Sequence, residues 1–325
     1  MKRRNNSLIS NTHPIEQPVK TITFEQALKS FLLDCRAKNL APRSIEFYEY
    51  GLNYLKKIFQ KQSIPLDIYS ITARQIKDHF IGYMLDNRLA SNTVNGRIKC
   101  CKAFFRYLYE EKIIAQNLAD QFQLIIAEKK MIQTLTKDQM IQLLNQPNRD
   151  SFTGFRDYTI MMILLETGIR ISECIALEMD DINLKEQEIR IKLGKGRKAR
   201  RVPIQKTCIQ ILKKYIVERG DAETNSLFVN IDHGSLKLRT IQENIQTFGK
   251  AAMITGVRVS PHTFRHTMAK FYILNGGDIF TLQQILGHTT LEMVKYYVEL
   301  FDTDIKNQHQ KFSPVENINL QRKVI

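Results

Sequence analysis

The first residues in this sequence that are suited to phosphate chemistry flank a helix break. Gly168 interrupts one helical pattern and a second begins near Arg170, so a guanidinium lies at a loop-to-helix junction. Free backbone N–H groups at such a junction attract an anion, and an arginine can add paired hydrogen bonds to it. Taken alone, Arg170 is more often a surface arginine paired with an acidic neighbour, here Glu166 or Glu173.

A second stretch, residues 194–200, concentrates glycine and positive charge. Gly194 and Gly196 let the backbone turn and approach a ligand closely. Lys195 and Arg197 add charge that an anionic partner would neutralise, although a solvated basic loop explains them equally well. The stretch is not a nucleotide-binding P-loop, because the Gly-x4-Gly-Lys-Ser/Thr spacing is missing.

A third signal is a predicted helix that begins at Pro261, a residue suited to a first turn. His262 and Arg265 then lie three positions apart on one face, where together they can bind a phosphate. In isolation, a capping histidine beside an exposed arginine is slightly favoured. His266 points to another side of the helix and is a weaker candidate.

The fourth signal follows an apolar helical face that Gly287 ends. His288 therefore lies just past a helix end, and Tyr296 and Tyr297 come further along. Adjacent residues of a helix point about 100° apart, so one of the two tyrosines at most faces a given site. A phenol can act as a nucleophile, but a buried core tyrosine is the more frequent role of any single tyrosine.

The elements before these signals read as a small all-helical domain. After a polar lead-in, apolar residues recur at helical spacing, and Thr23 is placed to cap the first helix. We expect a lead-in over 1–21 and a helical domain over 22–112, with helices over 23–38, 43–61, 72–85 and 91–111.

The elements that carry the signals read as a mixed domain. We expect a linker over 113–133, a catalytic domain over 134–302 and a tail over 303–325. Thr136 and Gln139 form a helix-capping pair at the start of the catalytic domain. Residues 188–193 alternate apolar and polar, as a half-buried strand does, and 201–204 can return beside them. The fold class is mainly α, with a small antiparallel sheet.

Composition favours a polyanionic partner. The chain has 48 Lys and Arg against 33 Asp and Glu, a formal charge of +15, and it is 43% apolar. This charge suggests nucleic acid or an anionic membrane surface as the partner, although a soluble basic protein without such a partner is the alternative. No apolar run is long enough to span a membrane, and the N-terminus has no signal-peptide pattern. The five cysteines lack a CxxC pair, so we expect reduced thiols and no zinc site.

Taken in order, the signals resemble the tyrosine recombinase family (phage-integrase, lambda-integrase-like) over about residues 20–305, through the runs Thr-Gly-Ile-Arg, Gly-Lys-Gly, His-Thr-Phe-Arg-His and Leu-Gly-His. The resemblance implies a helical SAM-like core-binding domain and a mixed α+β catalytic domain. Matched residue by residue, the catalytic set is Arg170, Lys195, His262, Arg265, His288 and Tyr297. Tyr296 matches the spacing from the last histidine less well. Glu173 matches an acidic residue that supports the first arginine.

The chemistry that these residue types allow is transfer of a phosphodiester to a phenol. Arg170 and Arg265 can donate paired hydrogen bonds to the phosphate oxygens as charge gathers there. No evident cluster of Asp and Glu could hold Mg²⁺, so we expect neither metal nor other cofactor. A histidine, His262 or His288, accepts the phenol proton or holds the phosphate. The resemblance implies that Lys195 protonates the leaving 5′-oxygen.

The resemblance also implies the partner and the setting. Family members act on double-stranded DNA as homotetramers that join two sites through a Holliday junction, and a monomer or dimer off DNA is compatible with this. We expect DNA contacts from basic residues of the helical domain and the hairpin, although a solvated helix face explains the former nearly as well: Arg43, Arg97, Lys99, Lys102 and Arg197. The tail, 303–325, would dock on a neighbouring protomer. The expected setting is cytoplasmic and nucleoid-associated, of prokaryotic, phage or mobile-element origin.

Two other functions remain open at this point. A type IB topoisomerase uses the same covalent chemistry but relaxes supercoils without a partner site. A catalytically inactive DNA-binding protein would retain the positive charge without the catalytic activity. The complete set of six catalytic residues argues against this alternative. Because no additional arm-binding domain is evident before the helical domain, we expect a two-domain enzyme similar to Xer or transposon-borne members. Integration, excision, dimer resolution and inversion all remain compatible.

Overall fold

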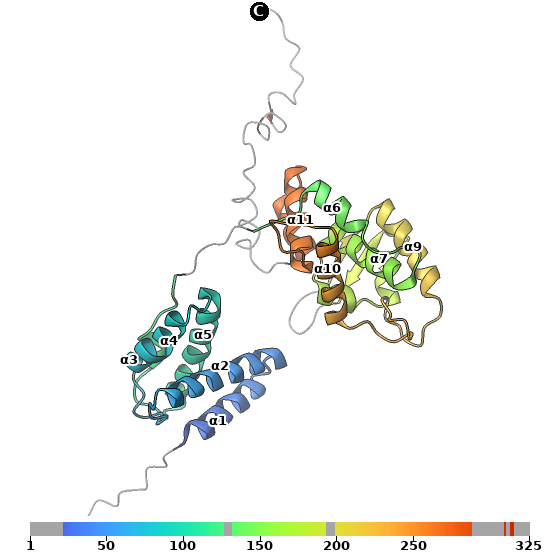
Figure 1. Ribbon diagram of the computed structural model, residues 1–325. Coiled ribbons are helices and arrows are strands. Elements are labelled where there is room, and N and C mark those ends of the chain that lie inside the picture. The colour runs from blue at the N-terminus through green and yellow to red at the C-terminus, as the bar shows by residue number, and fades with distance from the viewer. Residues whose placement is uncertain (1–21, 127–131, 193–198, 288–308, 310–312, 315–325) are drawn as a thin grey trace, which may run out of the picture. The chain divides into compact units, whose positions relative to one another are not determined.

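The computed structural model describes residues 22–126, 132–192, 199–287, 309 and 313–314. The chain divides between Lys129 and Lys130 into two compact units, each with a hydrophobic core of its own (Figure 1). None of the described helices is long and apolar enough to cross a bilayer.

Over its described residues, the first unit contains helices and the loops between them, and no strand. Its elements are α1 (Phe24–Ala37), α2 (Pro42–Lys61), α3 (Ala73–Gln75), a π-helical segment η1 (Ile76–Ile81), α4 (Gly82–Asp86), α5 (Ser91–Glu110) and a short 3-10 helix η2 (Leu118–Asp120). Helices α2 and α5 pack against each other, and α1 packs against both. The third predicted helix is thus present, with a π-helical segment in its middle.

The capping and packing of α1 follow from its sequence. Thr23 accepts a hydrogen bond from the backbone N–H of Gln26, and Gln26 reciprocates, so the predicted cap is confirmed. Phe24 and Phe31 face Phe104 of α5 at centroid distances of 5.5 and 5.7 Å. These tilted and edge-on aromatic pairs place α1 and α5 in one core, although the two helices are far apart in the sequence.

Part of the expected linker belongs to the first unit. Ile114, Leu118 and Phe122 are buried in its core, although we expected them to connect the units. Lys102 holds this stretch in place, because its ammonium donates hydrogen bonds to the carbonyl oxygens of Ala119 and Phe122. The connection between the units therefore begins later than the composition of the stretch suggests.

The second unit combines helices with a small sheet. Its elements are α6 (Lys137–Leu144), α7 (Phe152–Thr167), α8 (Ile171–Ile175), a 3-10 helix η3 (Met179–Asp181), β1 (Ile182–Asn183), β2 (Glu188–Ile191), β3 (Arg200–Pro203), α9 (Lys206–Arg219), α10 (Leu238–Ala251), α11 (Pro261–Leu274) and α12 (Ile279–Leu286). Helix α7 is central and packs against α9 and α11 (Figure 1).

The three strands form an antiparallel sheet in the order β1-β2-β3. In the predicted hairpin Ile189 pairs with Val202 and Ile191 pairs with Arg200. Ile189, Ile191 and Val202 are buried, so one face of the hairpin lies on the core. The predicted hairpin is confirmed, and β1 adds an edge strand that was not expected.

Candidate active site

The backbone turn after α7 fixes the position of Arg170. Gly168 ends α7 in the left-handed conformation, with φ of 60°. A Cβ at this position would lie 2.7 Å from Cδ2 of Leu286, so the turn requires glycine both for its conformation and for the close approach of α12. Arg170 then stands at the N-cap of α8, as predicted.

Glu173 binds Arg170 twice. One carboxylate oxygen accepts the backbone N–H of Arg170 at 2.9 Å and the other accepts its Nη1 at 2.9 Å. The same two oxygens accept Nη2 and Nη1 of Arg200 at 2.8 and 3.2 Å. Glu173 is thus hydrogen-bonded to Arg170 on one side and to a second arginine on the other.

The hydrogen bonds keep Glu173 ionised despite its burial. Burial by itself raises the pKa of a carboxyl group. Here the hydrogen bonds and positive charges of Arg200 and Arg170 outweigh burial and lower the pKa of Glu173 to about 2. Two guanidiniums share one carboxylate, so the cluster keeps a net positive charge at neutral pH. Such a cluster attracts a phosphate.

Arg170 keeps donors available. Its side chain is 27% exposed, whereas that of Glu173 is 10% exposed. Within the described part of the chain, Nε and Nη2 of Arg170 have no hydrogen-bond acceptor, because Glu173 takes only Nη1 and the backbone N–H. Glu173 therefore fixes the guanidinium along one edge and leaves the other edge for a ligand.

Arg265 ties the same turn to the end of α12. Ser260 caps α11 and Pro261 occupies its first turn, as predicted. One helical turn later, Arg265 donates Nη1 to the carbonyl oxygen of Gly168 at 2.7 Å and Nη2 to that of Leu286 at 2.8 Å. The side chain is buried, with 6% of the residue exposed. Arg265 thus lies beside the turn that carries Arg170.

The two histidines of α11 differ in environment. His262 is exposed and His266 is half-buried. Burial lowers the pKa of His266 to about 4, and the nearby charges of His262 and Arg265 contribute. His266 is therefore neutral at physiological pH and lies close to both predicted site residues, although it was the weaker candidate in the sequence analysis.

Arg200 was not singled out from the sequence. The alternation of β3 is the signal that could have identified it, because Arg200 shares a strand face with Val202, which is buried. Its neighbour Arg201 points to the other face, where its side chain is 74% exposed and pairs with Glu188 at 3.1 Å. Of these two consecutive arginines, one is therefore internal and the other lies at the surface.

Several predicted site residues lie outside the described residues: Lys195, Arg197, His288, Tyr296 and Tyr297. So does most of the expected tail, 303–325. Within the described part of the chain, no group of three or more His, Cys, Asp or Glu could hold a metal ion.

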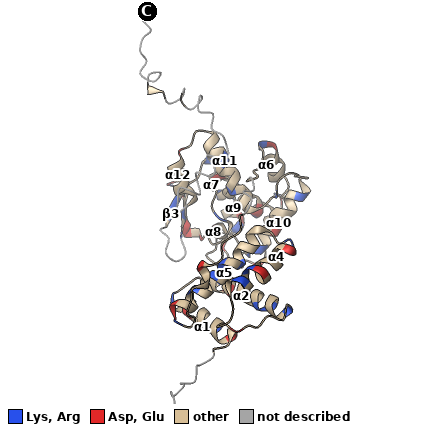
Figure 2. Cartoon of the chain, turned by 90° about the vertical axis from the view of Figure 1, so that its left-hand side faces the viewer, with Lys and Arg blue, Asp and Glu red and all other residues tan. Residues whose placement is uncertain are grey.

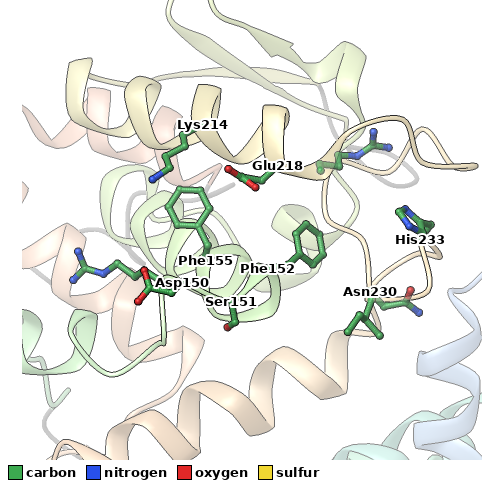
Figure 3. Close-up of a pocket in the computed structure, with 11 residues that line it drawn as sticks. Asp150, Ser151, Phe152, Phe155, Lys214, Glu218, Asn230 and His233 are labelled. Carbon is green, nitrogen blue, oxygen red and sulfur yellow. The ribbon is translucent and has the colours of Figure 1, made fainter.

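A cavity of about 470 Å³ lies elsewhere in the second unit (Figure 3). It is lined by residues that surround the start of α7 and the end of α9, including Ser151, Phe152, Lys214, Glu218 and His233. Of its two arginines, Arg219 donates to three backbone carbonyls and Arg149 caps the end of α6. Neither Arg170 nor Arg265 lines the cavity, so we do not assign the reaction to it.

The expected DNA contacts of the first unit fall into two groups. Arg43 and Lys99 are exposed. Arg97 places its guanidinium 4.1 Å from the ring centroid of Tyr50, which presents an arginine and an aromatic ring together. Figure 2 shows basic residues along α5. Lys102 has the intramolecular role described above, so its contact with DNA stays a prediction that the geometry favours least.

Comparison with known families identifies the family of the chain. Residues 133–304, more than half of the chain, match the phage integrase family. The chain belongs to this family. The matched range contains Arg170, His262 and Arg265, as well as Lys195, His288 and Tyr297.

Curated relatives are similar over nearly their whole length. The tyrosine recombinase XerD of Staphylococcus haemolyticus is 29% identical over 283 residues, which cover 85% of this chain and 94% of that protein. The tyrosine recombinase XerC of Halalkalibacterium halodurans is 28% identical over 302 residues, covering 89% of this chain and 98% of that protein. Together with the family match, these relatives place the chain among the tyrosine-type site-specific recombinases.

Solved structures show the same fold. XerH recombinase bound to a palindromic difH substrate has a TM-score of 0.70 at 20% identity and covers 89% of this chain and 85% of its own. The Tn1549 transposon integrase in complex with transposon right end DNA has a TM-score of 0.70 at 19% identity and covers 90% and 99%. The predicted tyrosine-recombinase fold is therefore confirmed.

Proposed function

We propose that this member of the phage integrase family cleaves and rejoins double-stranded DNA at specific sites through a 3′-phosphotyrosyl intermediate on Tyr297. The observation that carries the proposal is that Arg265 of α11 binds the backbone turn that carries Arg170. Among the described residues Arg170 has unused donors, and Arg265 binds the carbonyl oxygen of Gly168, two residues before Arg170. Two guanidiniums at the same turn suit a phosphate whose negative charge grows during the reaction.

The cleavage step transfers one phosphoester. The phenol oxygen of Tyr297 attacks the phosphorus, the bond to the 5′-oxygen breaks, and the phenol proton goes to a base. A free tyrosine has a pKa near 10, so it must lose its proton as it attacks. Lys195 supplies the proton that the leaving 5′-oxygen takes up. Attack by a 5′-hydroxyl of a second duplex then reverses the step and joins the strands.

Either of two histidines can perform the remaining tasks in this proposal. His262, which is exposed beside Arg265 on α11, and His288 hold the phosphate or accept the phenol proton.

Removal of one donor to a developing charge typically costs about 10²- to 10³-fold in rate, so each arginine is worth about 3 to 4 kcal/mol to the transition state. One phosphoester bond replaces another at each step, so the bond energy is retained and the reaction needs no nucleotide as an energy source.

The wider setting is proposed from the relatives and the charge. The chain acts on two duplex sites as a homotetramer. The first unit contributes phosphate contacts from Arg43, Arg97, Lys99 and Lys102, and the hairpin contributes Arg197. The C-terminal residues, 303–325, dock on a neighbouring protomer. We place the reaction in the cytoplasm, on chromosomal or mobile-element DNA. Free thiols on all five cysteines fit a reducing compartment.

A suicide substrate tests the proposal. DNA nicked next to the cleavage site traps the covalent intermediate, which is resolved from free protein on a denaturing gel. We expect wild type to form the adduct, and Arg170→Ala or Arg265→Ala to lose at least 100-fold in rate while still binding DNA. Arg239→Ala is the control, because Arg239 is exposed and its ion pair is with its helical neighbour Glu243. Loss of DNA binding in both site variants would instead assign these arginines a structural role.

The same material separates recombination from relaxation. Supercoiled plasmid without a specific site should remain supercoiled in the presence of wild-type protein. Sustained relaxation of such a plasmid would favour a type IB topoisomerase. Binding without any adduct would favour an inactive DNA-binding protein.

A further inference from the structure

We propose that Arg200 is a positioning residue for DNA cleavage: it holds Glu173, and through it Arg170, against the end of α12. The inference rests on the recombination chemistry proposed above and adds to it a residue that does not touch the DNA. Arg200 is the first residue of β3, and its side chain is 10% exposed. An arginine buried to this extent must satisfy its donors inside the protein.

The contacts of Arg200 run in two directions. Toward α8, Nη2 and Nη1 bind the two oxygens of Glu173 at 2.8 and 3.2 Å, a fork-to-fork pair. Toward α12, Nε donates to the carbonyl oxygen of Ile285 at 2.8 Å. A lysine has one point of charge and cannot reproduce this planar arrangement. One guanidinium therefore connects the hairpin, the start of α8 and the end of α12.

The end of α12 is built around this guanidinium. Arg200 binds the carbonyl of Ile285, and Arg265 binds that of Leu286, so two cations cap the C-terminus of the helix, where the helix dipole favours positive charge. A Cβ at Gly287 would lie 2.9 Å from Nη1 of Arg200, so a larger residue there would have to shift the guanidinium. Figure 2 shows β3 beside α12, with basic residues on the strand.

The geometry also explains why Arg200 affects Arg170. Glu173 has four donors, two from Arg170 and two from Arg200. Without Arg200, the carboxylate keeps only the contacts to Arg170 and is free to rotate with it. The buried carbonyl of Ile285 also loses its side-chain donor. A shift of about 1 Å in a catalytic group can reduce a rate by about 10²-fold, so the expected loss lies between about 10- and 100-fold.

The test compares two neighbouring arginines. Single-turnover cleavage of the suicide substrate is measured at saturating DNA for wild type, Arg200→Ala, Arg200→Lys and Arg201→Ala, together with the Kd for the same DNA. We expect Arg200→Ala to cleave about 10- to 100-fold more slowly, with the Kd changed less than about threefold. Arg200→Lys should recover part of the loss, and Arg201→Ala should cleave as wild type does. A rate within about threefold of wild type for Arg200→Ala overturns the proposal.

A double-mutant cycle shows whether Arg200 acts through Glu173. If it does, Arg200→Ala and Glu173→Gln together cost little more than the larger single loss, whereas fully additive losses overturn the proposed route. Thermal unfolding checks that each variant is folded. If Arg200→Ala does not fold, Arg200→Lys decides: slower cleavage at unchanged Kd supports the proposal, and an unchanged rate contradicts it. Failure of wild type to form any adduct would instead reject the recombinase function.

Discussion

Glu173→Gln is the substitution whose effect on stability the structure defines best. Glutamine keeps the shape of the side chain but replaces one acceptor oxygen with an NH2 group, which would face N–H donors of Arg170 and Arg200. A pKa lowered from 4.5 to about 2 corresponds to about 3 kcal/mol of preference for the ionised carboxylate in the folded protein. We therefore expect the free energy of unfolding to fall by about 3 kcal/mol at pH 7.

The assay is chemical denaturation at two pH values. Because the folded-state pKa of Glu173 is depressed, its stabilisation is complete above the unfolded pKa near 4.5 and is lost as the pH falls toward 2. The difference between wild type and Glu173→Gln should therefore be about 1 to 1.5 kcal/mol smaller at pH 3.5 than at pH 7. The slopes of the two denaturation curves should agree, because both proteins unfold the same surface.

Two results would refute this reasoning. A loss below about 0.5 kcal/mol at pH 7 would mean that the four hydrogen bonds contribute no more than an exposed ion pair. A difference that does not change between pH 7 and pH 3.5 would mean that the charge of Glu173 is not what stabilises the fold. As a matched control, Glu243→Gln removes a carboxylate that is 59% exposed and paired with Arg239, and it should cost less than about 0.5 kcal/mol.

Two further predictions concern the surroundings of the site. Gly168→Ala should lower the free energy of unfolding by about 1 to 3 kcal/mol, because alanine is strained at φ of 60° and its Cβ meets Leu286. Gly256→Ala is the control, because Gly256 also has a positive φ but its Cβ would lie in open space. An unchanged thermal midpoint for Gly168→Ala would contradict the packing argument. His266 should titrate near pH 4 in an NMR experiment on the imidazole resonances. Because its pKa is lower in the folded protein, the protein should lose stability as the pH falls from 6.5 toward 4. A titration midpoint of His266 above pH 6 would contradict the burial argument.

Local signals in the sequence predicted the elements that position the site. The reciprocal cap of Thr136 and Gln139 and the helix ends at Gly168 and Gly287 are properties of a few neighbouring residues. The hairpin followed from alternation over 188–193, which places apolar residues on one face. Such local rules fix where helices and strands begin and end, and they placed Arg170 at its junction correctly.

Contacts between distant residues were not predictable in the same way. Arg200 and Glu173 are far apart in the sequence, and so are Arg200 and Ile285. The alternation of β3 can place Arg200 on the inward face, but no local pattern shows which groups it binds there. Lys102 likewise shares a helix with Arg97, yet its ammonium binds carbonyls of a later stretch. Strand β1 has only two residues, too few to show alternation.

Peptide mapping of the trapped adduct tests the central claim most directly. The covalent complex from the suicide substrate is digested with a protease and a nuclease, and the nucleotide-bearing peptide is sequenced by mass spectrometry. Our account predicts one modified residue, Tyr297, linked to a 3′-phosphate, and no adduct with Tyr297→Phe. The nucleotide on Tyr296, on another side chain or on a 5′-phosphate would contradict it.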